Sequence, residues 1–385
     1  MADNFCSAPW VSLFYQTDQA SVCCTNTDAI KMAPINFISS DVVKNLKKDF
    51  LNNEKPKTCI YCWQLEELGN ASLRTQINSM YPIDQSGLTE ETPTIIKYLE
   101  LRTSNLCNFA CRMCGPINSN RFDREVKENN KLQRYFLPMD VTGEFSNASQ
   151  EQIKNIAKNL DTLYLTGGEP MLIKEYHDIL DYLIENNHHE KIMLQITTNG
   201  SVFNPKLMEK ITQFKSVRII LSIDGIGNVA DYQRHGSDWE IVKQNLYLYL
   251  DLPNLDIVIN SVSSGYTILD ISSLVEFIID TRMAKKDFSW SLRRAVTPFQ
   301  IDFSLLNKDL TARALDQVHQ SLAKLSLTYT DDDQFFSQAI EELKSYVAEL
   351  EKNDYINFNK FVEFTKDLDE SRNESFEQVF GYKIY

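Results

Sequence analysis

The sequence predicts an α/β protein: a partial (β/α)6 barrel, with a small cysteine-bearing module before it and a helical extension after it. From about residue 95 to 295, short β-rich runs alternate with helical stretches, which indicates βα units around a parallel sheet. Residues 1–75 hold five of the eight cysteines, and the pattern beyond residue 301 is helical and acidic. We therefore divide the chain into a module (1–75), a linker (76–94), a barrel (95–300) and a C-terminal extension (301–385).

The barrel prediction depends on six β-rich runs separated by amphipathic stretches with apolar residues at three- and four-residue intervals. The predicted strands are 98–103, 162–166, 192–197, 217–223, 255–262 and 288–293, and helices between them include 175–185, 238–250 and 269–280. Six such units form an open, TIM-like barrel. In barrels of this type, the side chains that carry chemistry gather at the carboxyl ends of the strands. In the extension, helices are expected at 307–325, 331–352 and 355–368, as packing or as a lid.

Composition narrows the classes of function. Of the 385 residues, 43% are hydrophobic and 24% are charged, as in a globular protein. No apolar run approaches the ~18 residues of a membrane span, and the first residues do not resemble a signal peptide. The net charge of −14 would repel a phosphate backbone. We expect a cytoplasmic protein with no membrane or nucleic-acid partner, whose cysteines are thiolate ligands and not disulfides.

Three cysteines follow the first predicted barrel strand. Cys107, Cys111 and Cys114 have the spacing C-x3-C-x2-C. A thiolate triad of this kind suits an iron–sulfur cluster, because three ligands for four irons leave one iron open. The alternatives are buried thiols or a structural zinc site, although a closed zinc site needs a fourth ligand and none of the five histidines is near in sequence.

The C-x3-C-x2-C spacing resembles the signature of the radical S-adenosylmethionine (SAM) enzymes. The resemblance implies a [4Fe–4S] cluster on Cys107, Cys111 and Cys114, whose open iron takes the amino and carboxylate groups of SAM. One electron, from a donor such as flavodoxin or ferredoxin, would then split SAM into methionine and a 5′-deoxyadenosyl radical. That radical would remove a hydrogen atom from the substrate.

Two motifs after the second and third predicted strands extend the resemblance. Gly167-Gly168-Glu169, followed by Pro170, is similar to the family's GGEP motif, which holds the amino group of SAM. A strand-ending turn with a capping carboxylate would have the same sequence. Asn199, like Ser222 at the end of the fourth strand, is similar to family positions that contact the ribose and the methionyl carboxylate.

Three further residues are matched to SAM contacts with alternatives left open. Arg234 resembles a basic residue that pairs with the SAM carboxylate, a role that suits a guanidinium, but a solvated surface arginine is the alternative. Met113 matches the position near the adenine, or belongs to the core. Asp224 is expected to cap a helix, bind the ribose or meet the substrate. Tyr232, Arg293 and Arg294 point to the barrel mouth by position alone, and a packing role is the favoured alternative for each.

The five N-terminal cysteines suggest a second metal site. A four-ligand set of Cys6, Cys59 and Cys62 with either Cys23 or Cys24 fits zinc or an iron–sulfur cluster. The order C-x2-P-W, a short strand and then Cys-Cys resembles the SPASM and twitch modules, which carry auxiliary [4Fe–4S] clusters in radical SAM enzymes. Those modules usually follow the barrel, whereas this one precedes it.

Three functions remain open from the sequence. The resemblance implies a radical SAM enzyme, an oxidoreductase or maturase that oxidises, cross-links or epimerises a peptide or protein substrate. The first alternative is a radical dehydrogenase of a small molecule, and the second is a non-catalytic zinc-binding adaptor.

Overall fold

The computed structural model describes residues 4–67, 69, 71–139, 147–285, 288–328 and 334–385. By its contacts the chain forms two units. The first unit comprises Met1–Ser104, Asp140–Ile196 and Lys206–Val217, and the second comprises Asn105–Met139, Thr197–Pro205 and Arg218–Tyr385. Strands β6 (Met193–Thr198) and β7 (Ser216–Ser222) each run from the first unit into the second.

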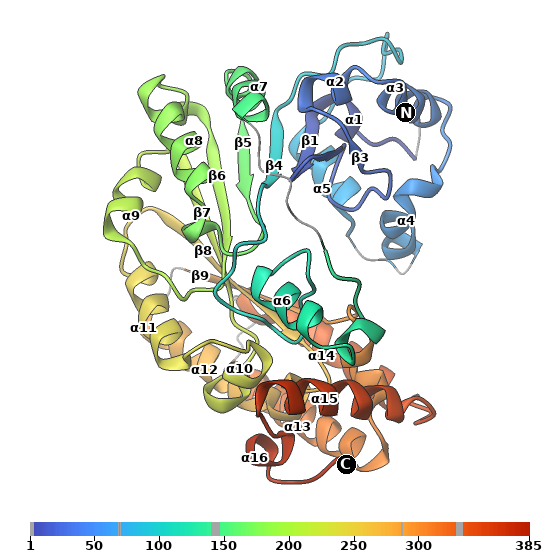
Figure 1. The fold of residues 1–385 in the computed structure, drawn as a ribbon, viewed down its shortest axis with the longest axis vertical. Helices are drawn as coiled ribbons and strands as arrows, with labels where there is room; N and C mark the ends of the chain where they lie inside the picture. The colour runs from blue at the N-terminus through green and yellow to red at the C-terminus, as the bar shows by residue number, and fades with distance from the viewer. Residues whose placement is uncertain (1–3, 68, 70, 140–146, 286–287, 329–333) are drawn as a thin grey trace. The chain divides into compact units, whose positions relative to one another are not determined.

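The first unit is built on a sheet with the strand order β3-β2-β1-β4-β5-β6. Strands β1, β4, β5 and β6 are parallel, while β2 is antiparallel to β1 and to β3 (Figure 1). The bounds are β1 Ser12–Gln16, β2 Gln19–Ser21, β3 Ile30–Lys31, β4 Tyr98–Arg102 and β5 Thr162–Leu165. Four successive residues of β4, from Tyr98 to Leu101, are buried, as expected for a parallel strand covered on both faces.

Helices of the first unit bury one apolar face each. In α8, Tyr176, Ile179, Leu180 and Leu183 recur at helical spacing and are all buried. The bounds are α1 Ala8–Val11, α2 Pro34–Ile38, α3 Asp41–Leu51, α4 Ile60–Glu67, α5 Leu73–Met80, α7 Asn147–Ala157, α8 Lys174–Glu185 and α9 Pro205–Ile211. Helix α5 begins after Ser72, which caps it by accepting a hydrogen bond from the Thr75 N–H. The helix continues to Met80 and so extends into the segment that the sequence predicts as a linker.

The second unit contains β7, β8 (Leu255–Ser263) and β9 (Phe288–Arg294), and the elements described after β9 are helices. Strands β8 and β9 are parallel, with Ile257 opposite Phe288. The helices are α6 Asn120–Glu128, α10 Gly227–Gln233, α11 Trp239–Leu250, α12 Ile271–Ala284, α13 Lys308–Thr328, α14 Ser337–Leu350, α15 Phe358–Arg372 and α16 Phe376–Phe380.

Helix α14 packs on β9, the last strand in the sheet order. The Gln338 side chain forms two hydrogen bonds with the backbone of Leu292: its Nε2 donates to the carbonyl at 2.7 Å, and its Oε1 accepts from the N–H at 3.0 Å. A side-chain amide thus takes the bonding pair that a neighbouring strand would otherwise use.

The predicted fold class is confirmed. All six predicted barrel strands are found, as β4 to β9, with bounds shifted by one or two residues at most. The three predicted C-terminal helices correspond to α13, α14 and α15, although the predicted start of the second, at 331, lies outside the described residues. In the described ranges, no helix is long and apolar enough to cross a membrane.

One feature of the sheet differs from the expectation of a module apart from the barrel. Strand β1 lies parallel beside β4, with Ser12 opposite Tyr98 and Gln16 opposite Arg102. Leu13 and Tyr15 of β1 are buried, so the N-terminal segment shares the core of the first unit. A strand of five residues in a cysteine-rich segment is too short for its sequence pattern to assign it to the barrel sheet.

Candidate functional site

The three barrel cysteines lie on the loop that follows β4, within the second unit. Cys107 and Cys111 are buried and Cys114 is half-buried. Two backbone hydrogen bonds fix the middle of the loop: Ala110 N–H donates to the His235 carbonyl and Arg112 N–H to the Gln233 carbonyl, both at 2.8 Å. The loop is therefore paired with the end of α10, like a short strand.

Donors surround the sulfur atoms of this loop. The Cys107 sulfur accepts from the Phe109 N–H at 3.4 Å and from Asn199 Nδ2 at 3.9 Å. Arg234 Nη1 lies 3.9 Å from the Cys111 sulfur. A hydrogen bond from Cys114 lowers the pKa of the Cys111 thiol against the effect of burial, and the Arg234 guanidinium lowers it further. The same hydrogen bond, together with burial, raises the pKa of Cys114, so the surroundings favour thiolate, the form that binds iron, at Cys111 before Cys114.

Arg234 and Asp224 form a buried ion pair next to this loop. Arg234 Nη2 lies 2.7 Å from Asp224 Oδ2, and the Val262 N–H donates to Asp224 Oδ1 at 3.0 Å. Burial raises the pKa of Asp224, and Arg234 opposes that rise. Arg234 is therefore not the solvated surface arginine of the alternative reading. Ser222, Asp224 and Arg234 line one small hollow together with Trp239.

Asn199 is held in one orientation by its neighbours. Its Nδ2 donates to Asn108 Oδ1 at 3.0 Å, and its Oδ1 accepts from the N–H and hydroxyl groups of Ser201 at 2.9 and 2.5 Å. The side chain thus links the carboxyl end of β6 to the cysteine loop. Met113, between Arg112 and Cys114, is half-buried.

The GGEP segment lies in the first unit, directly after β5. Gly167 has φ +123°, and a Cβ there would lie 2.7 Å from the Ser104 carbonyl oxygen, so only glycine fits. The Gly168 N–H donates to the same carbonyl at 3.1 Å. Glu169 is fully buried and accepts a hydrogen bond from the Met171 N–H at 3.1 Å. The capping carboxylate of the alternative reading is thus present.

Tyr176 is a contributor that sequence reasoning missed. Its hydroxyl accepts from the Thr103 N–H at 3.0 Å and lies 2.9 and 2.7 Å from the carbonyl oxygens of Leu101 and Thr166. It therefore fixes the carboxyl ends of β4 and β5 against each other. In the sequence it appears only as one apolar position of a helix, which gives no sign of this role.

Four of the five N-terminal cysteines line one cavity of the first unit. These are Cys6, Cys23, Cys59 and Cys62. Apart from Thr25 and Arg74, the rest of the lining is apolar: Ala8, Val22, Phe50, Leu73 and Ile77. Cys24 is exposed and is not part of this lining; its thiol hydrogen-bonds to Glu100.

The lining of this cavity is largely apolar, and burial governs the pKa of three of its four thiols. Burial raises the pKa of Cys6 and Cys23 above the ordinary value, and it raises the pKa of Cys59 to about 12. Two polar neighbours reach the sulfurs: Thr25 Oγ1 lies 3.7 Å from Cys62, and Asn26 Nδ2 donates to Cys59 at 3.6 Å. All eight cysteines are free thiols.

The two cysteine sets have the residue type and number that iron–sulfur clusters take as ligands. Four thiols around an apolar-lined cavity match the four-cysteine ligand set of a closed [4Fe–4S] cluster, and the three loop thiols with N–H donors match an open one. Within the described ranges, no group of three or more His, Cys, Asp or Glu side chains could hold a metal ion as the side chains stand.

Two of the three residues placed at the barrel mouth, Tyr232 and Arg294, have partners within the fold, in line with the packing alternative, whereas Arg293 is exposed. Tyr232 is buried, and its hydroxyl donates to Asp369 at 2.8 Å. Arg294 forms two hydrogen bonds with Asp302, at 2.6 and 3.1 Å. The Arg293 side chain lies 3.4 Å from the Ser291 hydroxyl of its own strand.

Part of the chain is similar in sequence to known proteins. Residues 101–270 match the model of the radical SAM superfamily. The radical SAM cyclopropyl synthase TigE of Paramaledivibacter caminithermalis is 29% identical over 166 residues, which are 40% of this chain and 34% of TigE. The GTP 3′,8-cyclase of Cronobacter sakazakii is 31% identical over 119 residues, 30% of each protein. The chain thus spans about a third of the length of these relatives.

Among solved structures, Streptococcus suis SuiB bound to its precursor peptide SuiA aligns with a TM-score of 0.39 and 15% identity. The alignment covers 88% of this chain and 74% of SuiB. The segment that matches the radical SAM model, residues 101–270, includes the cysteine loop and every predicted SAM contact.

Proposed function

We propose that this radical SAM domain binds a [4Fe–4S] cluster through Cys107, Cys111 and Cys114 and cleaves SAM. When bound, such a cluster supplies the electron that splits SAM into methionine and a 5′-deoxyadenosyl radical, which abstracts hydrogen from the substrate. The observation that carries the proposal is the loop itself: three thiols of one segment, with N–H donors on Cys107 and a guanidinium beside Cys111.

The residues around the loop have separate tasks in this proposal. Asn199 and the Phe109 N–H stabilise negative charge on the Cys107 sulfur. Arg234, fixed by Asp224, offers its remaining N–H groups to the SAM carboxylate. Glycine at 167 and 168 lets the backbone approach the SAM amino group, and Glu169 supplies its negative partner. Ser222 and Met113 are the proposed contacts to ribose and adenine.

The N-terminal cavity is proposed to hold a second cluster on Cys6, Cys23, Cys59 and Cys62. Four thiolates leave no coordination position open, so this set suits electron transfer and not SAM binding. Such a centre would accept the electron that remains on the substrate after hydrogen abstraction, which gives net oxidation. Cys24, outside the cavity lining, is not proposed as a ligand.

For the substrate, we favour a peptide or protein, because the N-terminal cysteine pattern resembles modules that accompany peptide maturases. A small-molecule substrate is the second candidate, favoured by the similarity to a GTP 3′,8-cyclase. A flavodoxin or ferredoxin is the proposed electron donor, and the cytoplasm the proposed location.

Anaerobic reconstitution with iron and sulfide tests the proposal. We expect about four irons per cluster, hence about eight per chain, and 5′-deoxyadenosine on addition of SAM and dithionite. Incubation with cell extract or candidate peptides, followed by mass spectrometry, should then reveal a product that has lost hydrogen. A chain that binds zinc, holds no iron and leaves SAM intact would contradict the proposal and favour the adaptor function.

A further inference from the structure

Arg112, between the second and third loop cysteines, is fully buried in the second unit. Its Nε donates to the Tyr232 carbonyl at 2.9 Å, and its Nη2 lies 2.5 Å from Asp369 Oδ1. The same nitrogen also contacts Glu374. The guanidinium lies against the face of Tyr232, with Cζ 3.5 Å from the ring centroid. A charged side chain between two cysteines is thus enclosed by α10, α15 and the turn after α15.

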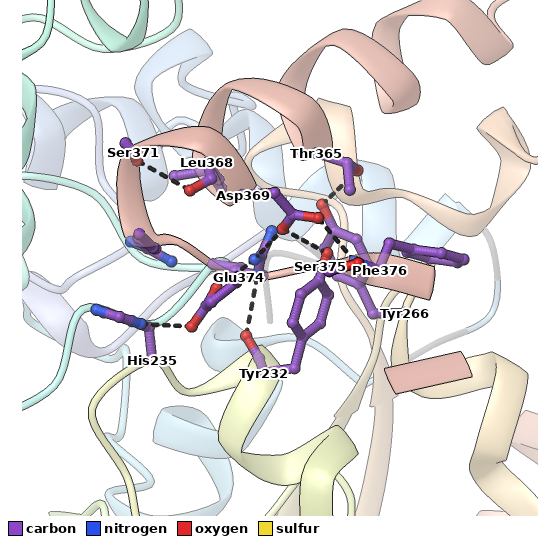
Figure 2. A network of polar contacts seen from close by, with 12 residues as sticks. Tyr232, His235, Tyr266, Thr365, Leu368, Asp369, Ser371, Glu374, Ser375 and Phe376 are labelled. Atoms are coloured by element: carbon purple, nitrogen blue, oxygen red, sulfur yellow. Dashed lines mark hydrogen bonds and ion pairs between the residues drawn. The ribbon is translucent and has the colours of Figure 1, made fainter. Parts of the chain in front are cut away.

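Asp369 is the centre of this network, as Figure 2 shows. Besides Arg112, its Oδ1 accepts from the Tyr232 hydroxyl at 2.8 Å. Its Oδ2 accepts from the Phe376 N–H and from the Tyr385 hydroxyl, each at 2.8 Å. One carboxylate therefore gathers the cysteine loop, α10, α16 and Tyr385.

Glu374 provides a second connection between the C-terminal segment and the cysteine loop. His235 Nδ1 lies 2.5 Å from Glu374 Oε1 (Figure 2), and the His235 carbonyl accepts from the Ala110 N–H of the loop. At the end of α15, the buried Arg372 pairs with Glu125 of α6 at 2.7 Å. The C-terminal segment is thus fixed on both sides of the cysteine loop.

Burial of this ion pair needs a reason beyond stability. A buried charge is costly unless it is paired and hydrogen-bonded, and an apolar side chain would fill the same space at no such cost. What the pair adds is a fixed orientation of the Arg112 side chain, since a planar guanidinium donates to its partners in one geometry. The positions of the Asp369 and Glu374 carboxylates therefore determine the position of the backbone between Cys111 and Cys114.

We propose that the C-terminal segment 369–385 is a positioning element for the cysteine loop, with Asp369 acting through Arg112. Its role is to hold Cys111 and Cys114 where they bind iron and to keep the cluster from dissociating. The cluster itself belongs to the proposed function, on which this inference rests. Asp369 touches neither SAM nor iron in this proposal, so it is a positioning residue.

Asp369→Asn, compared with Asp302→Asn, tests the proposal. Asp302 is an equally buried carboxylate of the second unit, paired with Arg294, with none of its described contacts on the cysteine loop. The first measurement is amide hydrogen exchange of the metal-free proteins. We expect faster exchange over residues 105–116 in Asp369→Asn than in Asp302→Asn, at matched thermal stability. Equal exchange in the two variants would overturn the proposal.

The second measurement is iron release from the reconstituted proteins to a ferrous chelator. Loss of an outer contact typically weakens metal binding by about 10- to 100-fold, so the loop cluster should be lost faster from Asp369→Asn by about that factor. The paramagnetic signal of the reduced cluster should also broaden. Release at the rate of Asp302→Asn would contradict the inference while leaving the proposed function intact.

A double variant guards against simple misfolding. Arg112→Met with Asp369→Leu removes both charges together, which avoids an unpaired buried ion. We expect its melting temperature to recover relative to Asp369→Asn, while exchange in the loop and iron release stay fast. Recovery of iron retention along with stability would mean that the pair only stabilises the fold. If wild-type protein binds no iron, the proposed function fails, and hydrogen exchange alone decides the positioning role.

Discussion

The two sets of cysteines differ in what surrounds them. The loop thiols have a charged group and N–H donors as neighbours: the Arg234 guanidinium lies beside Cys111, and the Asn199 amide donates to Cys107. The N-terminal thiols line a largely apolar cavity, where burial raises the pKa of Cys6, Cys23 and Cys59. The same ligand type is thus offered in two settings. In the loop, polar partners lower the pKa of Cys111 while the pKa of Cys114 is raised, and in the N-terminal cavity burial raises the pKa of three thiols.

The different surroundings suit the two cysteine sets to different functions. Thiolates in an apolar cavity must lose their protons as the metal binds, so metal binding there couples strongly to pH and to folding of the segment. A loop that already carries donors and a guanidinium is prepared for an anionic centre and for a polar ligand such as SAM. We expect the loop set to serve chemistry and the N-terminal set to serve electron transfer.

The largest expected effect comes from removing a loop ligand. Cys111→Ala should abolish 5′-deoxyadenosine formation, because two thiolates cannot hold an open cluster against solvent. Chromatography of the reaction with SAM and dithionite checks this. The N-terminal iron should remain, and retention of SAM cleavage in this variant would break the comparison between the two sets.

The next effect separates two neighbouring cysteines. Cys23→Ala should lose about four irons, because Cys23 lines the cavity, whereas Cys24→Ala should keep them. Both variants should still cleave SAM. Iron analysis with 5′-deoxyadenosine assays measures both outcomes, and equal iron loss in the two variants would refute the assignment of Cys23. Cys59→Ala is expected to behave as Cys23→Ala and to give no final product.

A moderate effect is expected at the turn after β5. Gly167→Ala forces an L-residue to φ +123° and brings its Cβ to 2.7 Å from the Ser104 carbonyl. The backbone strain alone should lower the free energy of unfolding by about 1–3 kcal/mol, and the clash adds to it. Gly87→Ala, at φ +79° with no atom within 4 Å of its Cβ, should cost only about 1 kcal/mol.

The same pair of glycine variants sharpens the comparison. Affinity for SAM should fall in Gly167→Ala and not in Gly87→Ala, while both keep the N-terminal iron. Chemical denaturation and equilibrium binding provide the two measurements. Unchanged SAM affinity in Gly167→Ala would exclude this turn from the SAM site.

The smallest effect concerns Lys47, next to Trp10 in the N-terminal segment. Burial lowers the pKa of Lys47 from 10.5 to about 8, while its ammonium donates to the Thr92 carbonyl and the Thr94 hydroxyl. The unfolded chain binds the proton more tightly, so this group should make the metal-free protein more stable as pH rises from 8 to 10.5.

Lys47→Met should lack that rise in stability. The measurement is the difference in melting temperature between variant and wild type across this pH range. Lys48→Met, at an exposed neighbouring position, provides the control and should follow the wild type. A difference that is constant with pH would show that Lys47 titrates as an ordinary lysine.

The fold was predictable from the sequence to the extent that its signal is local. The barrel strands are short apolar runs and the helices between them are amphipathic, so β4 to β9 could be assigned from periodicity. The place of β1 beside β4 could not, because pairing between strands more than 80 residues apart leaves no local mark.

The candidate site also contains residues that the sequence reveals and residues that only the structure reveals. The cysteine spacing and the GGEP motif are readable, since their chemistry requires fixed residues at fixed intervals. The choice between Cys23 and Cys24 needs the cavity, because two adjacent residues share every sequence feature but lie in different surroundings. The cysteine spacing gives no role to Arg112, because its partner Asp369 is 257 positions away.

The amide of Gln338 has a consequence for how a peptide substrate could be captured. Many peptide-binding proteins lengthen a sheet by adding the ligand as a further strand at an open edge. On β9, the donor and acceptor of Leu292 are already engaged by that side chain. A guest chain would have to displace helix α14 to pair there, so we expect a peptide to be recognised through its side chains at the strand ends and not by augmentation of this edge.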